Sequence, residues 1–175
     1  MALKRHLACF VATAVAAGLL VAPAFAAKAL NWNETFKNAD GKVLNFKVTS
    51  LTVTQTGWSA KVSFANLSKQ TIQVGNEFGI AFFANSKTTN PINASALAQA
   101  TTFAPKRPTA LKPGATWAGV IGGSGQLETA KTSGYARILF GPFVGVPGQK
   151  AATSWITDHA TSIPATSLTP SEPVA

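Results

Sequence analysis

Cysteine is almost absent from this chain of 175 residues, in which Cys9 is the only one. Cys9 lies in an N-terminal segment that we expect to be removed, so the mature protein would contain no thiol. Without thiols a chain forms no disulfide, and it provides neither a thiol nucleophile nor a thiolate ligand for a metal. Many small exported domains rely on disulfides, whereas this one is expected to be stabilised by the packing of its core alone.

Histidine and acidic residues are scarce as well. The chain has 2 histidines and 6 acidic residues, and His159 is the only histidine outside the N-terminal segment. One histidine without cysteine does not make a zinc or copper site in a single chain. Calcium requires clustered oxygen ligands, whereas the acidic residues are far apart in the sequence. We therefore expect neither a metal ion nor a cofactor.

Residues 1–26 have the layout of a cleaved secretory signal peptide. Basic residues precede an apolar run over residues 7–22, and the small residues of Ala-Phe-Ala stand directly before Ala27. The alternative is a membrane anchor, but the run is short for a span and no stop-transfer charges follow it. We expect a secreted or periplasmic protein that begins at Ala27 and has no stable membrane span.

Alternation of apolar and polar residues is the main structural signal in the rest of the chain. The segment WSAKVSFANL, 58–67, places an apolar residue at every second position, which is typical of a half-buried strand. The residues that would face the core are Trp58, Ala60, Val62 and Phe64. The preceding run, VLNFKVTSLTVT, also alternates but shifts its phase by one residue, which predicts a bulge. We interpret residues 43–67 as a β-hairpin.

Further strands are predicted where apolar runs lie between turn signals. These runs cover residues 71–74, 78–84, 111–122 and 135–145. The run at 78–84 is almost continuously apolar, as in a strand that is covered on both faces. The Ala-rich segment 93–103 is ambiguous and would also suit one or two helical turns. Helices long enough for parallel crossovers are missing, which favours an all-β, immunoglobulin-like antiparallel β-sandwich.

The domain organisation is predicted to be simple, with a single folded domain. An N-terminal extension at 27–42 would follow the signal peptide at 1–26, and the β-sandwich would occupy 43–159. The last segment, 160–175, is rich in proline and hydroxyl side chains and has little to bury. It is therefore predicted to be a disordered tail.

Two segments carry a resemblance to a known family. LKPGATWAGVI (111–121) and YARILFGPF (135–143) resemble the last strands of bacterial secreted immunoglobulin-like domains of the DUF4352 type. In those domains a Pro-Gly turn precedes a strand, and a strand rich in tyrosine or valine closes the sheet. The resemblance extends over about residues 43–145. It implies a small extracytoplasmic sandwich, and it assigns no catalytic residue because the family has no agreed ones.

Asp158 and His159 form an acid–histidine pair, which raises the hypothesis of a catalytic site. Ser124 in GGSGQ nearly matches the nucleophile elbow G-x-S-x-G, but Gln126 stands where the last glycine is required. Neighbours on a strand point to opposite faces, so Asp158 is poorly placed to orient His159. The pair also borders the predicted tail, where little would hold it rigid. A secreted serine hydrolase using Ser124, Asp158 and His159 is therefore kept only as an alternative.

Positive charge is in excess, with 15 basic against 6 acidic residues and a net charge of +9. Without Lys4 and Arg5, which would leave with the signal peptide, the mature chain carries +7. Such a protein suits an anionic component of the cell envelope or an acidic protein as its partner. No stripe of basic and aromatic residues points to nucleic acid. The candidate contacts for an anionic surface are Lys106, Arg107 and Lys112.

The four tryptophans divide into two groups. Trp58 and Trp117 are in phase with buried positions and are predicted to belong to the core. Trp32 and Trp155 flank the predicted sandwich. Each of these two would be either a plug packed at an edge or an exposed binding contact.

Three N-glycosylation sequons are present in the chain. They begin at Asn33, Asn66 and Asn93. Such triplets arise by chance in a chain rich in asparagine and threonine, and they matter only in a eukaryotic host.

The residues together favour an exported, non-enzymatic β-sandwich with a binding or structural role in the cell envelope or outside the cell. Two alternatives remain open at this point. One is the serine hydrolase described above. The other is a basic adhesin or effector that binds anionic surfaces.

Overall fold

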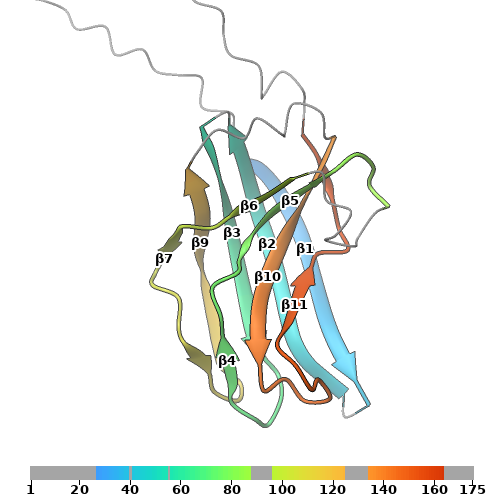
Figure 1. Cartoon of the computed structure of the whole chain (residues 1–175), viewed down its shortest axis with the longest axis vertical. Coiled ribbons are helices and arrows are strands. Elements are labelled where there is room, and N and C mark those ends of the chain that lie inside the picture. The colour runs from blue at the N-terminus through green and yellow to red at the C-terminus, as the bar shows by residue number, and fades with distance from the viewer. Residues whose placement is uncertain (1–26, 40, 55, 88–95, 125–133, 164–175) are drawn as a thin grey trace, which may run out of the picture.

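The fold is an antiparallel β-sandwich, seen in a computed structural model that describes residues 27–39, 41–54, 56–87, 96–124 and 134–163. These residues form two sheets that pack face to face, and they contain no helix (Figure 1). The predicted all-β class and antiparallel sandwich architecture are therefore confirmed. In the described part of the chain, no helix has the length and apolar character that crossing a membrane requires.

The described strands divide into a 5-stranded and a 7-stranded sheet. The first sheet has the order β1 (Lys28–Asn38), β2 (Gly41–Thr54), β3 (Gly57–Asn66), β9 (Thr116–Ser124) and β7 (Thr102–Ala104). The second has the order β6 (Ala96–Gln99), β5 (Gly79–Phe83), β10 (Tyr135–Val144), β4 (Ile72–Val74) and β8 (Ala110–Leu111). Two short strands also pair with β10, namely β11 (Thr153–Ile156) and β12 (Thr161–Ser162).

Strands β2 and β3 form the predicted hairpin. Their register shifts between Val48 and Ser50, where the sequence changes phase. The extra residue keeps both Val48 and Leu51 buried, because it restores the inward direction of the later side chains. On β3 the predicted alternation is confirmed, with Phe64 in the core and Lys61 exposed.

The segment predicted as an N-terminal extension, 27–42, is instead part of the sandwich. Strand β1 pairs with β2 from Lys28 opposite Leu51 to Asn38 opposite Gly41. The prediction was wrong because β1 is an edge strand with a register shift before Trp32, so its apolar residues do not alternate regularly. Strand β1 nevertheless places Trp32 in the core.

Strand β5 is buried on both faces, as its continuous apolar run predicted. Ile80 and Phe82 enter the core between the sheets. Phe83 is covered from the other side by the guanidinium group of Arg137, which lies 5.7 Å from the centre of its ring. The second sheet therefore has a buried layer on its outer side as well.

The Ala-rich segment 93–103 forms strands rather than helical turns wherever it is described. Strands β6 and β7 lie within it, and residues 93–95 lie outside the described part. Pairing of β6 with β5 and of β7 with β9 decides the conformation, since alanine has no strong preference for strands by itself.

The predicted tail, 160–175, contains a structured beginning. Thr161 pairs with Ala136 in β12 and is buried. Residues 160–163 are therefore part of the sandwich, which corrects the predicted boundary at 159. Residues 164–175 lie outside the described part.

Aromatic rings fill the centre of the core and hold the sheets together. The rings that surround Phe64 belong to Phe78, Trp117, Phe140 and Phe143, with centres 5.1 to 6.5 Å away. Such pairs contribute about 0.5–1.5 kcal/mol each beyond the burial of their area. The predicted core positions of Trp58 and Trp117 are confirmed. This packing makes the sandwich a rigid support for its loops.

The two ends of the sandwich carry different connections (Figure 1). The described chain begins and ends near the β2–β3 turn (Figure 1). Lys28 pairs with Leu51 close to that turn, and Thr161 pairs with Ala136 at the start of β10, at the same end of the sandwich. The opposite end consists of the β1–β2 turn, the β3–β4 loop (67–71), the β8–β9 turn (112–115) and the β10–β11 loop (145–152). We call this opposite end the distal end.

Candidate functional site

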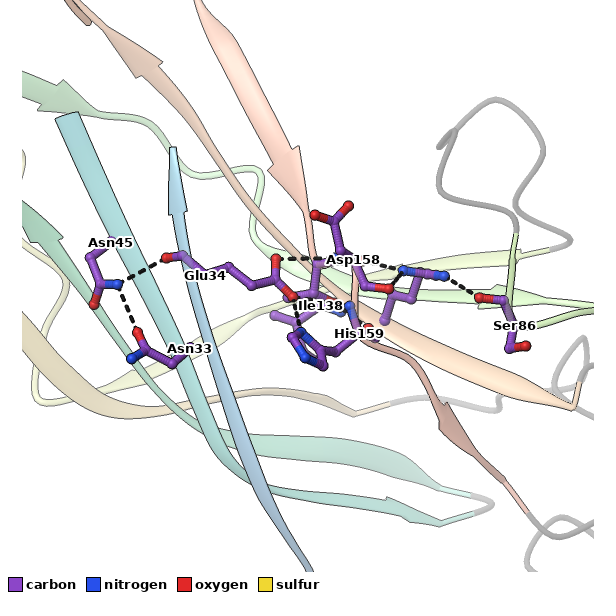
Figure 2. Close-up of polar contacts among 9 residues, drawn as sticks. Asn33, Glu34, Asn45, Ser86, Ile138, Asp158 and His159 are labelled. Carbon is purple, nitrogen blue, oxygen red and sulfur yellow. Dashed lines mark hydrogen bonds and ion pairs between the residues drawn. The ribbon is translucent and has the colours of Figure 1, made fainter. Parts of the chain in front are cut away.

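The acid–histidine pair of the sequence lies where the edges of the two sheets meet, in contact with Glu34 of β1 (Figure 2). The Glu34 carboxylate accepts hydrogen bonds of 3.0 Å from the backbone N–H groups of Asp158 and His159. Its Oε1 atom also lies 2.6 Å from His159 Nδ1. Trp32 stacks on the imidazole, with ring centres 6.1 Å apart. We call Trp32, Glu34, Asp158 and His159 the sheet junction.

The segment that carries His159 is held firmly, so the expectation of a loosely held, tail-side loop was wrong. The Thr157 hydroxyl donates a hydrogen bond of 2.9 Å to the His159 carbonyl. The Thr157 backbone N–H donates to the carbonyl of Ile138, 3.0 Å away, and the Ile138 N–H donates to the Thr157 hydroxyl, 3.1 Å away. Although the His159 side chain is 53% exposed, its backbone is fixed on both sides.

Arg137 of β10 supports the sheet junction from inside the fold. Its guanidinium group is buried and donates hydrogen bonds to the backbone carbonyls of Thr157, Asp158 and Ser86. Burial lowers the pKa of Arg137, while the negative charges of Asp158 and Glu34 act in the opposite direction. Arg137 therefore joins the 157–159 segment to the loop after β5, and its role is to order the backbone.

Ser124 does not reach the sheet junction. Glu34 stands in one cross-strand row with Phe46, Phe64 and Trp117. Ser124 lies seven residues further along β9 than Trp117, a distance of roughly 23 Å at about 3.3 Å per residue. The serine, acid and histidine of the hydrolase alternative are therefore not brought together.

A groove of about 280 Å³ runs beside the sheet junction, between residues 34–37 and 155–158. Trp155 lies in it and packs on Phe36 and Phe46, with ring centres 4.8 and 5.7 Å away. Trp155 is thus a half-buried plug at the edge of the sandwich, and Trp32 is 7% exposed. Neither of these predicted contacts is an open aromatic platform for a ligand.

Metal binding is not favoured at the sheet junction. The oxygens of Glu34 already accept three hydrogen-bond donors from the 158–159 segment. Among the residues that the structure describes, no group of three or more histidine, cysteine, aspartate or glutamate side chains is placed to hold a metal ion.

The three predicted contacts for anions have different surroundings. Arg107 is half-buried, donates to the carbonyl of Val74 and covers the ring of Phe103 at 5.6 Å. Its burial lowers the pKa of its guanidinium group. Lys106 and Lys112 are exposed. Arg107 is therefore engaged in packing, and of the three residues Lys112 lies at the distal end.

Five exposed lysines come together at the distal end, on four separate connections. They are Lys37 and Lys42 beside the β1–β2 turn, Lys69 before β4, Lys112 before β9 and Lys150 before β11. Lys37 stands directly opposite Lys42 in the register of β1 and β2. No acidic side chain occurs among the described residues of these connections, and Asp40 lies outside them. The structure thus assembles a basic surface from lysines that are scattered in the sequence.

Asn66 at the end of β3 fixes two of these connections. Its side chain is fully buried and donates to the carbonyls of Gln70 and Leu111, at 2.7 and 2.9 Å. Its side-chain oxygen, Oδ1, accepts hydrogen bonds from both the backbone N–H and the hydroxyl of Ser68. Lys69 and Lys112 are therefore carried on a preorganised backbone. Because both amide hydrogens of Asn66 are used inside the fold, its sequon is not accessible in the folded protein.

A second groove, of about 470 Å³, lies within the distal end. Lys42 and Lys69 stand on its walls, together with Leu67 and Pro147. The β10–β11 loop is held there by Asn38, whose amide donates to the Pro147 carbonyl at 2.8 Å. Three connections thus meet around one hollow that is lined by both cationic and apolar groups.

Sequence reasoning missed most of this surface. Lys37 and Lys42 are close in the chain, but they are far from Lys69 and Lys150, and no local motif joins the four. Only Lys69 carried a usable signal, since it lies between the predicted strands 58–67 and 71–74. Lys37 and Lys42 stood in the predicted extension, and Lys150 follows the last predicted strand. Glu34 carried no comparable signal, because its partners lie more than 120 residues away.

Comparison with protein-family models, with curated proteins and with solved structures found no match for this chain. The resemblance to secreted immunoglobulin-like domains therefore stays a prediction from the sequence.

Proposed function

We propose that the protein is an exported, non-enzymatic binding module that attaches to an anionic surface or polymer through its distal end. The observation that carries this proposal is the convergence of five exposed lysines on four connections, without an acidic side chain among their described residues. Cations gathered on one end of a rigid body create a local positive potential that attracts polyanions.

The pairing of Lys37 with Lys42 supports a binding role for this surface. Like charges directly opposite each other in an antiparallel pair destabilise the sheet. A pair of opposite charges at these two positions would favour folding by up to about 1 kcal/mol relative to the two lysines. The fold therefore carries a small energetic cost at the position where the two ammonium groups would meet an anion together.

The sheet junction favours a binding protein over the serine hydrolase. Glu34 is occupied by backbone and imidazole donors, and Ser124 lies in another part of the first sheet. A general base must be within hydrogen-bond reach of the nucleophile, directly or through one water. The export of the protein rests on the signal-peptide layout of residues 1–26.

The test compares two double variants that remove the same net charge. Lys42→Gln with Lys69→Gln alters the distal end, whereas Lys47→Gln with Lys61→Gln alters exposed lysines on β2 and β3 away from it. The measured quantity is the dissociation constant for long-chain polyphosphate, determined by calorimetry at several salt concentrations. We expect the distal variant to bind at least about tenfold more weakly, since each contact contributes on the order of 1 kcal/mol.

The control variant should bind nearly as the unaltered protein does. Affinity should fall with added salt, because exposed charges are screened over about 10 Å at 0.1 M ionic strength. Equal affinities of the two double variants would show that only the net charge matters and would overturn the distal end as the binding site.

A further inference from the structure

Apolar side chains are exposed among the lysines of the distal end. The large exposed hydrophobic residues of the described chain are Leu67, Leu97, Val120 and Val144. Two of them belong to this end: Leu67 begins the β3–β4 loop and is 44% exposed, and Val144 ends β10 and is 47% exposed. The same surface therefore combines cationic and apolar tips.

Both apolar tips are held on ordered backbone. The Leu67 N–H donates to the carbonyl of Val43 at 2.8 Å, next to the buried side chain of Asn66. Val144 is paired with Gln73 of β4. Their exposure is thus built into the register of the sheets rather than resulting from a loose loop.

We propose that the partner of the distal end is an anionic lipid bilayer, and this inference rests on the function proposed above. The lysines would contact the headgroup phosphates, while Leu67 and Val144 enter the apolar boundary beneath them. Surfaces that bind peripherally to membranes combine buried apolar area with attraction to anionic lipids. Each lysine near such a surface contributes about 1 kcal/mol.

The apolar tips favour a bilayer over a soluble polyanion. A hydrated polyphosphate or acidic polysaccharide offers no apolar phase, so it gains nothing from Leu67 or Val144. A bilayer offers a layer of anions above an apolar phase, and this order suits an end of the sandwich that carries both exposed lysines and exposed apolar side chains. The groove between Lys42 and Lys69, with Leu67 on its wall, has the mixed character that a lipid headgroup and the start of its chains require.

The arrangement of the sandwich allows this end to meet a flat surface. All four connections of the distal end lie opposite the points where the described chain begins and ends (Figure 1). Neither Ala27 nor Ile163 therefore emerges from the contact surface. The domain would stand on the membrane end-on, with its strands directed away from it.

The experiment is flotation of the exported protein with two kinds of vesicle, one of phosphatidylcholine alone and one of phosphatidylcholine mixed equally with phosphatidylglycerol. We expect binding to the mixed vesicles and none to the neutral ones. Leu67→Ser with Val144→Ser should weaken binding to the mixed vesicles by roughly tenfold or more. The same variant should lose much less affinity for polyphosphate than for the mixed vesicles, because polyphosphate offers no apolar phase to the two side chains.

The matched control is Leu97→Ser with Val120→Ser, which removes the same two residue types at 51% and 42% exposure elsewhere on the molecule. It should bind the mixed vesicles normally. Equal binding by the distal and the control variant would overturn the lipid proposal. Binding to polyphosphate without binding to mixed vesicles would overturn it as well and would leave the proposed function standing. If the double variant Lys42→Gln with Lys69→Gln still bound both polyphosphate and the mixed vesicles normally, the lipid proposal and the proposed function would both be overturned.

Discussion

The distal end and the sheet junction both contain several charged groups, but these groups differ in their partners. At the sheet junction, Glu34 accepts three donors, and the buried Arg137 donates to three backbone carbonyls. At the distal end, five lysines extend into solvent, and two of them face each other directly. Charge whose partners lie within the chain orders the fold, whereas the lysines of the distal end, beside which no acidic side chain occurs among the described residues, are available to another molecule.

The burial of the two regions differs in the same sense. Arg137 is among the largest fully buried side chains, and Trp32 closes over the imidazole of His159. The lysines of the distal end are all exposed, whereas Asn66, which supports the connections of Lys69 and Lys112, is buried. We therefore expect changes at the sheet junction to alter stability, and changes at the distal end to alter binding.

The largest effect on stability is expected from Arg137→Ala. It would leave a cavity and remove the donors of three carbonyl groups, so the free energy of unfolding should fall by about 3–5 kcal/mol. Arg107→Ala is the control, because Arg107 is also an arginine packed over an aromatic ring but is only half-buried. Its loss should be about 1–2 kcal/mol. Urea denaturation measures both, and equal losses would contradict a special structural role of Arg137.

Asn66→Ala should have the next largest effect on stability, and it is expected to weaken binding as well. The carbonyls of Gln70 and Leu111 would lose their donor inside the fold, which should lower the free energy of unfolding by about 2–3 kcal/mol. The loops that carry Lys69 and Lys112 would also lose their support, so affinity for polyphosphate should fall several-fold. Denaturation and calorimetry on the same sample test this, and unchanged affinity would show that the loops need no preorganisation.

Glu34→Ala and His159→Ala separate the two partners of the sheet junction. Removal of the carboxylate affects three hydrogen bonds to a charged group and should cost about 2 kcal/mol. Removal of the exposed imidazole leaves both backbone donors in place and should cost about 1 kcal/mol or less. Thermal unfolding compares them, and a larger loss in His159→Ala would mean that the ring, rather than the backbone, holds the segment.

The smallest effect, and the only one of opposite sign, is expected from Lys37→Gln. Relief of the repulsion with Lys42 should raise the free energy of unfolding by a few tenths of a kcal/mol. The same change should weaken binding to polyphosphate by a few-fold. A variant that is less stable than the unaltered protein would show that the two ammonium groups do not repel each other in the fold.

The predicted fold rested on strands that have one buried face. The alternation from Trp58 to Phe64 and the phase shift after Val48 both report how side chains face a core, and the structure repeats them. Strand β1 was not predicted, because it is an edge strand whose pairing depends on β2. Strand β12, at the start of the predicted tail, was not predicted either, because it is defined only by its pairing with β10.

The candidate site could be predicted far less well, for a physical reason. Asp158 and His159 attracted attention because they are adjacent, yet the residue that organises them is Glu34, which is brought close by the folding of β1. The lysines of the distal end are each unremarkable along the chain. They form a surface only because alternate turns of an antiparallel sandwich fall at the same end, which requires the strand order that the structure supplies.

The most direct test of this account is to measure polyphosphate affinity side by side for Lys42→Gln with Lys69→Gln and for His159→Ala. We expect at least about tenfold weaker binding for the distal variant and unchanged binding for His159→Ala. Unchanged binding by the distal variant, together with loss of binding in a folded His159→Ala protein, would contradict it and would place the function at the sheet junction.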